Sequence, residues 1–265
     1  MPAEHLNYAP LASTYHQRYA FSPLEGVAAA LRALAQHLAP QHILEVGCGT
    51  GRWVTELAAD YRISGLDLSY AMLQQAHLQG EQQPSLRTGL VCGTAETLPF
   101  PNATFDLVFC ANALHHFDAP QTFISEAWRT LRPGGALAVV GQNPRGMRDR
   151  WYVYDYFEGT YQTDLRRFPS WGTTLDWMVT CGFEQITLQP VEHIVDTKQG
   201  RQVLNDPFLQ KHAVSQLALL SDEAYATGMQ RIRADLDQAE ARGETLAFPT
   251  DLLLSLLVGR KSVAK

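Results

Sequence analysis

Three glycines at alternate positions, Gly47, Gly49 and Gly51, follow a short apolar run and precede a helical pattern. The run 43–46 indicates the end of a buried strand, and the apolar spacing after Arg52 indicates a helix. A glycine-rich turn between a strand and a helix can adopt backbone angles closed to other residues, and it lets a ligand approach the main chain. This order favours folds in which a strand leads into a helix at a ligand-binding edge.

Two acidic residues frame this turn. Glu45 lies at the end of the first predicted strand, and Asp67 closes the next one, where an acid can bind ribose hydroxyls. A dinucleotide-binding fingerprint would need a third glycine at position 52, which is Arg52 in this chain. The order of strand, acid, glycines, helix, strand and acid resembles motifs I and II of the class I S-adenosylmethionine (SAM) methyltransferases.

The alternation of strands and helices continues beyond the turn and predicts the fold class. Such alternation favours a parallel sheet that is covered by helices on both faces. We expect an α/β fold with a doubly wound, mostly parallel, seven-stranded Rossmann-like sheet whose last strand is antiparallel. The strands are expected at 42–46, 62–66, 85–92, 105–111, 136–140, 183–189 and 252–258.

Two stretches interrupt this rhythm. Residues 143–170 are aromatic and rich in Arg, and 199–244 carry helical patterns in place of a strand. The run 151–157 is either a lid that faces a methyl acceptor or a helix packed on the sheet edge. The predicted segments are N-terminal cap helices over 1–40, a SAM-binding core over 41–142, an aromatic lid over 143–172, and a C-terminal part of the same domain over 173–265 with a helical insertion over 199–244.

Local capping patterns place the starts of four helices. A capping box at 22–25 has Pro at the first helical position, and Asp118 with a Gln three residues later indicates a second start. Ser69 and Ser221 each precede a helical pattern and are expected to be N-caps.

The composition is that of an ordinary globular chain of 265 residues, which suits one large domain or one domain with an insertion. The net charge is −6 and there is no long Lys/Arg run, so we expect no nucleic-acid partner. The four cysteines lack C-x-x-C spacing and are interpreted as free thiols. Residues 1–5 lack the pattern of a signal peptide, and no apolar run approaches the ~20 residues of a membrane span. We expect a cytoplasmic protein, monomeric or homodimeric.

The resemblance extends over about residues 40–140. Further motifs at 93–100, 105–108, 113–116 and 131–135 come in the order seen in type-11 methyltransferases, a group that includes enzymes like those of ubiquinone and menaquinone biosynthesis. The resemblance implies SAM as methyl donor, S-adenosylhomocysteine as product and a small molecule as acceptor. The alternatives are a protein or RNA methyltransferase, and a catalytically silent SAM-binding subunit.

The resemblance also implies cofactor roles for residues at the matching positions. Glu45 and the amides of the glycine turn suit the amino-acid end of SAM, and Asp67 suits the ribose. Thr94 stands where many relatives carry the Asp that binds the adenine amino group, so adenine recognition shifts to the backbone of Ala95 and Glu96. The expected cofactor-binding residues are Tyr15, Arg18, Glu45, Gly47, Cys48, Gly49, Asp67, Leu68, Thr94, Ala95, Glu96 and Ala111.

Several of the candidates have an alternative interpretation. Glu45 is either a ligand of the cofactor or only a partner of the helix dipole, and Asp67 is either a ligand of the ribose or only an acid at the start of the next helix. Tyr15 and Arg18 either close over the methionine carboxylate or belong to an ordinary amphipathic helix. His115 and His116 follow the fourth strand at the edge where such sheets bind ligands, and His has the pKa to take a proton from an acceptor. They are either the catalytic base or walls of the pocket. Their adjacency on a strand edge is not metal-ligand spacing, and we expect no metal.

Overall fold

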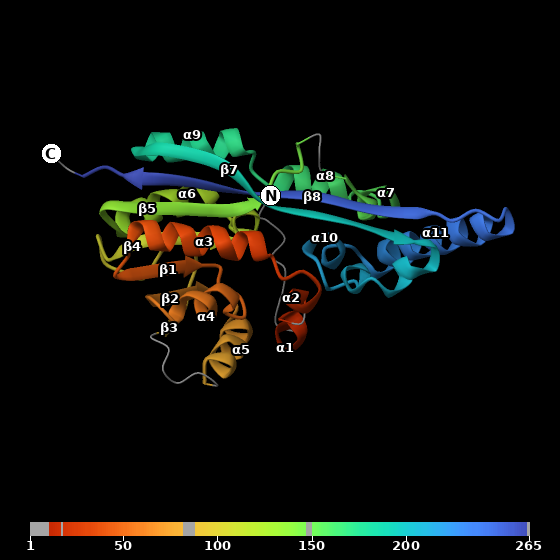
Figure 1. The fold of residues 1–265 in the computed structure, drawn as a ribbon, viewed down its shortest axis with the longest axis horizontal. Helices are drawn as coiled ribbons and strands as arrows, with labels where there is room; N and C mark the ends of the chain where they lie inside the picture. The colour runs from red at the N-terminus through yellow and green to blue at the C-terminus, as the bar shows by residue number, and fades with distance from the viewer. Residues whose placement is uncertain (1–10, 17, 82–87, 147–149, 264–265) are drawn as a thin grey trace.

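The computed structural model describes residues 11–16, 18–81, 88–146 and 150–263. Its centre is a twisted sheet between two layers of helices, and a further group of helices lies beyond one end of the sheet (Figure 1). The expectations about residues 1–5 and about 85–87 of the third strand fall outside the described residues. No helix in the described part of the chain is long and apolar enough to cross a membrane.

Five parallel strands form one half of the sheet, in the order β3-β2-β1-β4-β5. The chain passes through β2 and β3 before it returns to the other side of β1, so the strand order reverses between β1 and β4. Sheets of this kind bind ligands at the carboxyl ends of the strands beside such a reversal. The strands are β1 (His42–Val46), β2 (Arg62–Asp67), β3 (Thr88–Cys92), β4 (Phe105–Ala111) and β5 (Leu131–Gln142).

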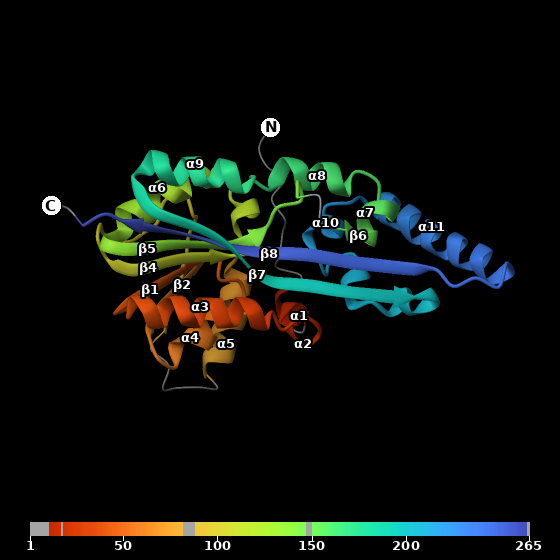
Figure 2. The same ribbon diagram turned by 45° about the horizontal axis from the view of Figure 1, so that its top comes forward.

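The antiparallel part of the sheet is larger than predicted. β8 (Ala247–Lys261) runs antiparallel to β5 and also pairs with β7 (Phe183–Gln199), which confirms the expected direction of the last strand. The short β6 (Arg150–Trp151) joins β8 as well, so the sheet has eight strands within the described residues. The first half of β8 and the second half of β7 leave the parallel strands as a two-stranded ribbon (Figures 1 and 2).

Helices cover both faces of the parallel strands, which confirms the doubly wound α/β class. Figure 2 shows one layer on each side of the sheet. One face carries α3 (Glu25–Leu38), α4 (Arg52–Ala58) and α5 (Tyr70–Glu81), and the other carries α6 (Pro120–Thr130) and α9 (Trp171–Cys181).

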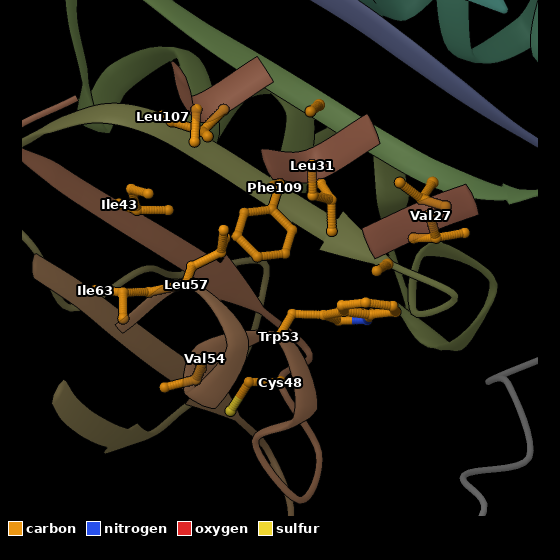
Figure 3. Close-up of a cluster of buried hydrophobic side chains, with 14 of the residues drawn as sticks. Val27, Leu31, Ile43, Cys48, Trp53, Val54, Leu57, Ile63, Leu107 and Phe109 are labelled. Atoms are coloured by element: carbon orange, nitrogen blue, oxygen red, sulfur yellow. The ribbon is translucent and has the colours of Figure 1, made fainter. Parts of the chain in front are cut away.

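Each face has its own apolar core. On the first face, Phe109 of β4 packs among Leu31 of α3 and Trp53 and Leu57 of α4 (Figure 3). On the second face, β4 and β5 pack against α6 and α9. The two cores bury β1, β4 and β5 on both sides, which explains why the sequences of these strands are mainly apolar.

A third core lies beyond the sheet, in a group of helices that we name the outer lobe. It joins the segment after β6 to the insertion between β7 and β8, with Phe157, Leu217, Ile232 and Phe248 among its buried members. The ribbon of β7 and β8 carries this lobe away from the parallel strands (Figure 1). Its elements are α7 (Tyr152–Tyr156), α8 (Thr160–Arg167), η3 (Gly200–Asn205), η4 (Pro207–Leu209), α10 (Ser215–Ala218) and α11 (Asp222–Ala241).

Two of the four predicted helix caps are wrong. α3 begins at Glu25 without a side-chain cap from its own segment, and the amide of Gly26 donates instead to Glu192 of β7 at 2.6 Å. α6 begins at Pro120, and the amide before it, of Ala119, donates to Glu96 at 3.2 Å rather than being capped by Asp118. In both places a carboxylate from a distant part of the chain has replaced the local cap.

The two serine caps are confirmed. Ser69 accepts a hydrogen bond from the amide of Met72 at 3.4 Å, and Ser221 accepts one from Ala224 at 3.1 Å. Both helices therefore begin where the sequence pattern placed them.

Candidate functional site

The glycine turn after β1 adopts the backbone geometry that its sequence predicts. Gly47, Gly49 and Gly51 have φ angles of +75°, +53° and +81°, in the left-handed region that glycine adopts without strain. The amide of Gly47 donates to the carbonyl of Leu66 at 2.7 Å, which anchors the turn to β2. A Cβ on Gly47 would lie 2.5 Å from the Cβ of Ala113, whereas a Cβ on Gly49 would meet nothing within 4 Å. Gly49 therefore leaves space open above the turn.

Asp67, at the end of β2, is fixed by this turn. Its carboxylate accepts hydrogen bonds from the amide of Gly49 at 2.7 Å and from the amide of Ser69 at 2.8 Å. Burial raises the pKa of Asp67, and the two amides oppose that rise. Each carboxylate oxygen has two lone pairs, so the side chain is held in place and can still accept from a ligand hydroxyl.

Glu45, at the end of β1, is a buried carboxylate. Only 1% of the residue is exposed, and its Oε2 has no hydrogen-bond partner among the described residues. Burial raises the pKa of Glu45 well above its usual value, and Asp67 raises it further. Burial and these two acids also raise the pKa of the Cys48 thiol, which is therefore neutral. A cation bound beside Glu45 would compensate its buried charge, as the ammonium group of an amino acid can.

These residues open into a cavity of about 1680 Å³. Sites for one small ligand commonly occupy ~300–1,000 Å³, so this cavity has room for a cofactor and a second molecule. It is bounded by the carboxyl ends of the parallel strands, by the N-terminal helices and by the outer lobe. The predicted site residues all line it: Tyr15, Arg18, Glu45, Gly47, Cys48, Gly49, Asp67, Leu68, Thr94, Ala95, Glu96, Ala111, His115 and His116.

One side of the cavity is formed by the segments after β2, β3 and β4. Leu68 is 57% exposed and offers an apolar surface to the cavity, and Thr94 is exposed beside the buried Ala95. The carboxylate of Glu96 is engaged at the start of α6, which leaves its backbone as the part that can meet a ligand. Ala111 is buried at the end of β4.

The N-terminal helices α1 (Ala12–Tyr15) and α2 (Arg18–Phe21) form another side. The Cζ of Arg18 lies 4.8 Å from the centre of the Tyr15 ring and 5.9 Å from the centre of the Phe208 ring in η4. The N-terminal helices and the insertion therefore meet at the cavity, although about 190 residues separate them in the sequence.

The two histidines lie after β4 in the short helix η2 (Leu114–His116). His115 stacks on Phe168 with 3.8 Å between ring centres, and Nη2 of Arg167 lies 3.2 Å from Nδ1 of His116. Burial lowers the pKa of both imidazoles, and the charges of Arg167 and Arg18 lower them further, to about 3 for His116. The expectation of a near-neutral pKa is therefore wrong for both rings, which are uncharged at pH 7.

The contact with Arg167 gives the two histidines different hydrogen-bonding roles. A guanidinium only donates, so Nδ1 of His116 accepts and its neutral ring carries the proton on Nε2. In this state His116 is a donor and cannot take a proton from a ligand. His115 is the imidazole that is left for such a role. Among the described residues, no group of three or more His, Cys, Asp or Glu side chains could hold a metal ion.

The aromatic run 151–157 faces the outer lobe more than the cavity. Within it, Trp151 alone lines the cavity. Tyr154 donates its hydroxyl to the buried Asp164 at 2.8 Å, and Asp164 also accepts from Gln216 of α10 at 2.6 Å. The run is therefore packed mainly within the outer lobe, where it contacts the insertion.

The predicted site residues did not include Arg167, Phe168 and Phe208, which form part of the cavity wall at α8 and η4. Arg167 and Phe168 lie beside the two histidines, and Phe208 lies beside Arg18. None of them belongs to a motif, and a basic residue in the last turn of a helix is ordinarily interpreted as a partner of the helix dipole. The only available signal was the aromatic and basic composition of 143–170.

Comparison with known proteins adds a family and a fold. Residues 44–139 match the family model described as a methyltransferase domain. The chain is similar to a malonyl-[acyl-carrier protein] O-methyltransferase of Hahella chejuensis, with 31% identity over 59% of this chain and 55% of that protein. It is also similar to a demethylmenaquinone methyltransferase of Lactiplantibacillus plantarum, with 29% identity over 58% of this chain and 75% of that protein. The chain spans 40–46% of the length of several other curated relatives.

A solved structure extends the likeness to nearly the whole chain. A SAM-dependent methyltransferase from Thermotoga maritima matches with a TM-score of 0.58 and 19% identity, over 96% of this chain and 98% of that one. At this level of identity the likeness concerns the fold, which includes the segments outside residues 44–139.

Proposed function

The chain carries a class I SAM-dependent methyltransferase domain, and from this premise we propose that it transfers the methyl group of SAM to a small-molecule acceptor and releases S-adenosylhomocysteine. We place this reaction in the cytoplasm, as expected from the sequence. The experiment described below distinguishes this function from two alternatives: a protein or RNA methyltransferase, and a catalytically silent SAM-binding subunit.

The main support for the proposal is that the residues around the glycine turn match the amino group and the ribose of SAM. The buried Oε2 of Glu45 has no hydrogen-bond partner among the described residues, and an ammonium group would supply one. Asp67 is fixed by two backbone amides and can accept from a ribose diol. Gly49 leaves open the space that a side chain would fill between these two acids and the ligand.

With the amino group of SAM at Glu45 and its ribose at Asp67, the other cavity residues are assigned to the adenine and the methionine carboxylate. Leu68 provides an apolar surface for the adenine, and the backbone of Ala95 and Glu96 provides its polar contacts. Tyr15 and Arg18 close over the methionine carboxylate from the N-terminal side. The exposed Thr94 carries no charge, so in this proposal it contributes little to adenine recognition.

Methyl transfer needs alignment more than it needs chemical groups from the protein. When bound, SAM supplies a methyl group activated by a sulfonium. The residues of this chain hold an acceptor in line with that group and exclude water, which is mainly a positioning task. The cavity has room for both molecules, and the outer lobe and the N-terminal helices enclose it. An enclosed site of this kind supports a small acceptor rather than a folded RNA.

A proton must leave the acceptor if the acceptor is a hydroxyl or an acidic carbon. We propose His115 as the residue that accepts it, because its ring is uncharged and Phe168 fixes its plane. His116 then has the different task of holding Arg167. An acceptor that is already a neutral amine or a thiolate would need neither histidine as a base.

The test is to incubate the purified protein with SAM and a panel of hydroxyl, amine and thiol acceptors. Mass spectrometry follows S-adenosylhomocysteine and the methylated product, and calorimetry measures SAM binding. The proposal expects binding and acceptor-dependent turnover. Turnover on RNA or protein alone would favour the alternative enzymes, and tight binding without turnover on any class would favour a silent subunit. No binding of SAM would overturn the proposal.

A further inference from the structure

We propose that the carboxamide of Asn112 binds the methyl acceptor, and that the reacting group of the acceptor is a hydroxyl or an uncharged amine. This inference rests on the proposed methyl transfer, because it concerns the second molecule in the same cavity. Asn112 directly follows β4 and lines the cavity. Its backbone conformation, its position beside the glycine turn and its carboxamide each support the assignment.

The backbone of Asn112 has a conformation that costs free energy. Its φ is +52°, in the left-handed region, where an L-residue is less stable than glycine. Asn tolerates this region better than most residues, but glycine tolerates it best. Of the described residues other than glycine with a positive φ, Asn112 is the one that is both polar and part of the cavity wall. Residues in such conformations cluster at ligand sites, so we expect its side chain to serve a ligand.

Neighbouring contacts hold Asn112 in this conformation. Its amide donates to the carbonyl of Val140 on β5 at 2.9 Å. The next residue, Ala113, is buried against the glycine turn, where a Cβ on Gly47 would lie 2.5 Å from the Ala113 Cβ. The carbonyl of Ala113 also accepts from the amide of His116 at 2.8 Å. The main chain is therefore fixed on both sides of Asn112, and its side chain starts from a fixed point.

Asn112 lies where the cofactor side of the cavity meets the acceptor side. The residue before it, Ala111, is assigned to the cofactor, and the residue after it packs on the glycine turn. Three residues further along the chain, His115 stacks on Phe168 in the part of the cavity assigned to the acceptor. Asn112 is exposed between two buried neighbours, and it belongs to the cavity wall. Its side chain is thus placed to contact a group beside the transferred methyl.

The carboxamide of Asn112 is available to a ligand. It forms no hydrogen bond with any side chain or backbone group that the structure describes. Gln142, the last residue of β5, lines the cavity as well, and its carboxamide likewise has no partner within the described ranges. The ends of β4 and β5 thus contribute uncharged polar groups, each with one acceptor oxygen and two N–H donors.

A carboxamide selects a reacting group that carries both a hydrogen and a lone pair. Its oxygen can accept the hydrogen of a hydroxyl or of an uncharged amine, which leaves a lone pair on that oxygen or nitrogen for the methyl group. An ammonium ion has no free lone pair, a C–H group is a weak donor, and a thiolate has no hydrogen to donate. Asn112 does not take the proton, so its task is to orient the acceptor, and His115 keeps its proposed role as base for a hydroxyl.

The test measures how phenol, aniline and toluene bind to protein saturated with S-adenosylhomocysteine, by ligand-observed NMR at millimolar concentrations. The three probes are similar in size, and toluene alone lacks a polar hydrogen and a lone pair. The variants are Asn112→Gly and Asn112→Ala, with Ala103→Gly as the control. Ala103 has nearly the same φ, +51°, but it is exposed in the turn before β4 and is absent from the described residues that line the cavity.

We expect the affinity for phenol, for aniline or for both, relative to that for toluene, to fall about 2–10-fold in the two Asn112 variants, as for the loss of one uncharged hydrogen bond. A fall for phenol alone would assign a hydroxyl, and a fall for aniline alone would assign an amine. Ala103→Gly should leave both ratios unchanged. Asn112→Gly should keep the Tm of wild type, because the strain that glycine relieves offsets the freedom that it adds to the unfolded chain.

Unchanged ratios in the Asn112 variants would overturn the inference while leaving methyl transfer in place, as would wild-type protein that binds neither phenol nor aniline. Equal falls in Ala103→Gly would also overturn it. A marked loss of Tm in Asn112→Gly would show that the carboxamide supports the fold instead. Weaker binding of S-adenosylhomocysteine with unchanged probe ratios would assign Asn112 to the cofactor. Failure of wild-type protein to bind S-adenosylhomocysteine would remove both proposals.

Discussion

Gly49 and Gly243 are a matched pair for testing whether the glycine turn binds the cofactor. Both have a positive φ, +53° and +71°, and a Cβ on either would meet no atom within 4 Å. Gly49 lines the cavity after β1. Gly243 follows α11 and is absent from the described residues that line the cavity. Alanine at the two positions therefore creates the same backbone strain in two different surroundings.

The expected loss of stability is similar for Gly49→Ala and Gly243→Ala. An L-residue in the left-handed conformation costs about 1–2 kcal/mol, and neither new methyl group meets a neighbour. For a domain of this size each kcal/mol corresponds to about 2–4 °C in Tm, so both variants should unfold about 2–8 °C below wild type. Only the methyl group on Gly49 enters the space where the amino-acid end of SAM is proposed to lie. We expect the affinity of Gly49→Ala for SAM to fall at least about tenfold, which is about 1.4 kcal/mol.

Thermal unfolding of the cofactor-free proteins gives the loss of Tm, and calorimetric titration with SAM gives the loss of affinity. Equal losses of Tm with an affinity loss confined to Gly49→Ala would support the assignment. Wild-type affinity in Gly49→Ala would refute the contact between cofactor and backbone. A comparable affinity loss in Gly243→Ala would show that strain alone explains the effect.

Three further predictions test other parts of the structure. Asp67→Ala should weaken SAM binding about 10–100-fold, since a hydrogen bond to a charged group contributes about 1.5–3 kcal/mol. Asp60→Ala, on the exposed turn after α4, should leave the affinity for SAM unchanged. Unchanged calorimetric affinity for Asp67→Ala would exclude the ribose contact. Gly26→Ala should lower the free energy of unfolding in urea by about 1–3 kcal/mol, because its Cβ would lie 2.0 Å from the Val191 carbonyl oxygen. The Cβ of Gly80→Ala would meet nothing within 4 Å, so this variant should lose no stability. Equal losses in the two variants would contradict the docking of α3 on β7. The pKa of His116 falls from 6.5 to about 3 on folding, so its stabilising contribution is complete above pH 6.5 and is lost progressively as the pH falls towards 3. His116→Gln should therefore flatten the decline of Tm below pH 6.5, and superimposable curves would contradict the shift.

The sequence predicted the parts of the fold that local patterns determine. β1 and β4 begin and end at the predicted residues, because both strands are buried on two faces and are mainly apolar in sequence. The glycine turn followed from the strand before it and the helix after it, without knowledge of any tertiary contact. The fourteen candidate residues came from these local patterns together with the family resemblance, and all of them line one cavity.

Contacts between distant segments explain what could not be predicted. Glu192 accepts a hydrogen bond from the Gly26 amide at the start of α3, 166 residues away in the sequence. Glu96 accepts one from the Ala119 amide at the start of α6, 23 residues away. β7 is mostly exposed, so its outer half lacks the apolar run by which a buried strand is recognised. Arg167 contacts His116 because the end of α8 lies beside η2 at the cavity, an arrangement without a local signal.

The position of β8 has a consequence for the order in which a newly made chain can fold. β8 is the last of the described strands to be synthesised, and it pairs with β5, β6 and β7. The parallel strands with the glycine turn need no residue after 246 for their pairing, whereas β7 has no other partner among the described strands. We expect a chain still attached to the ribosome to form the parallel half first and to expose the edge of β5 until β8 emerges. A chain halted before β8 should therefore engage chaperones through that edge, and the acceptor side of the cavity would be completed last.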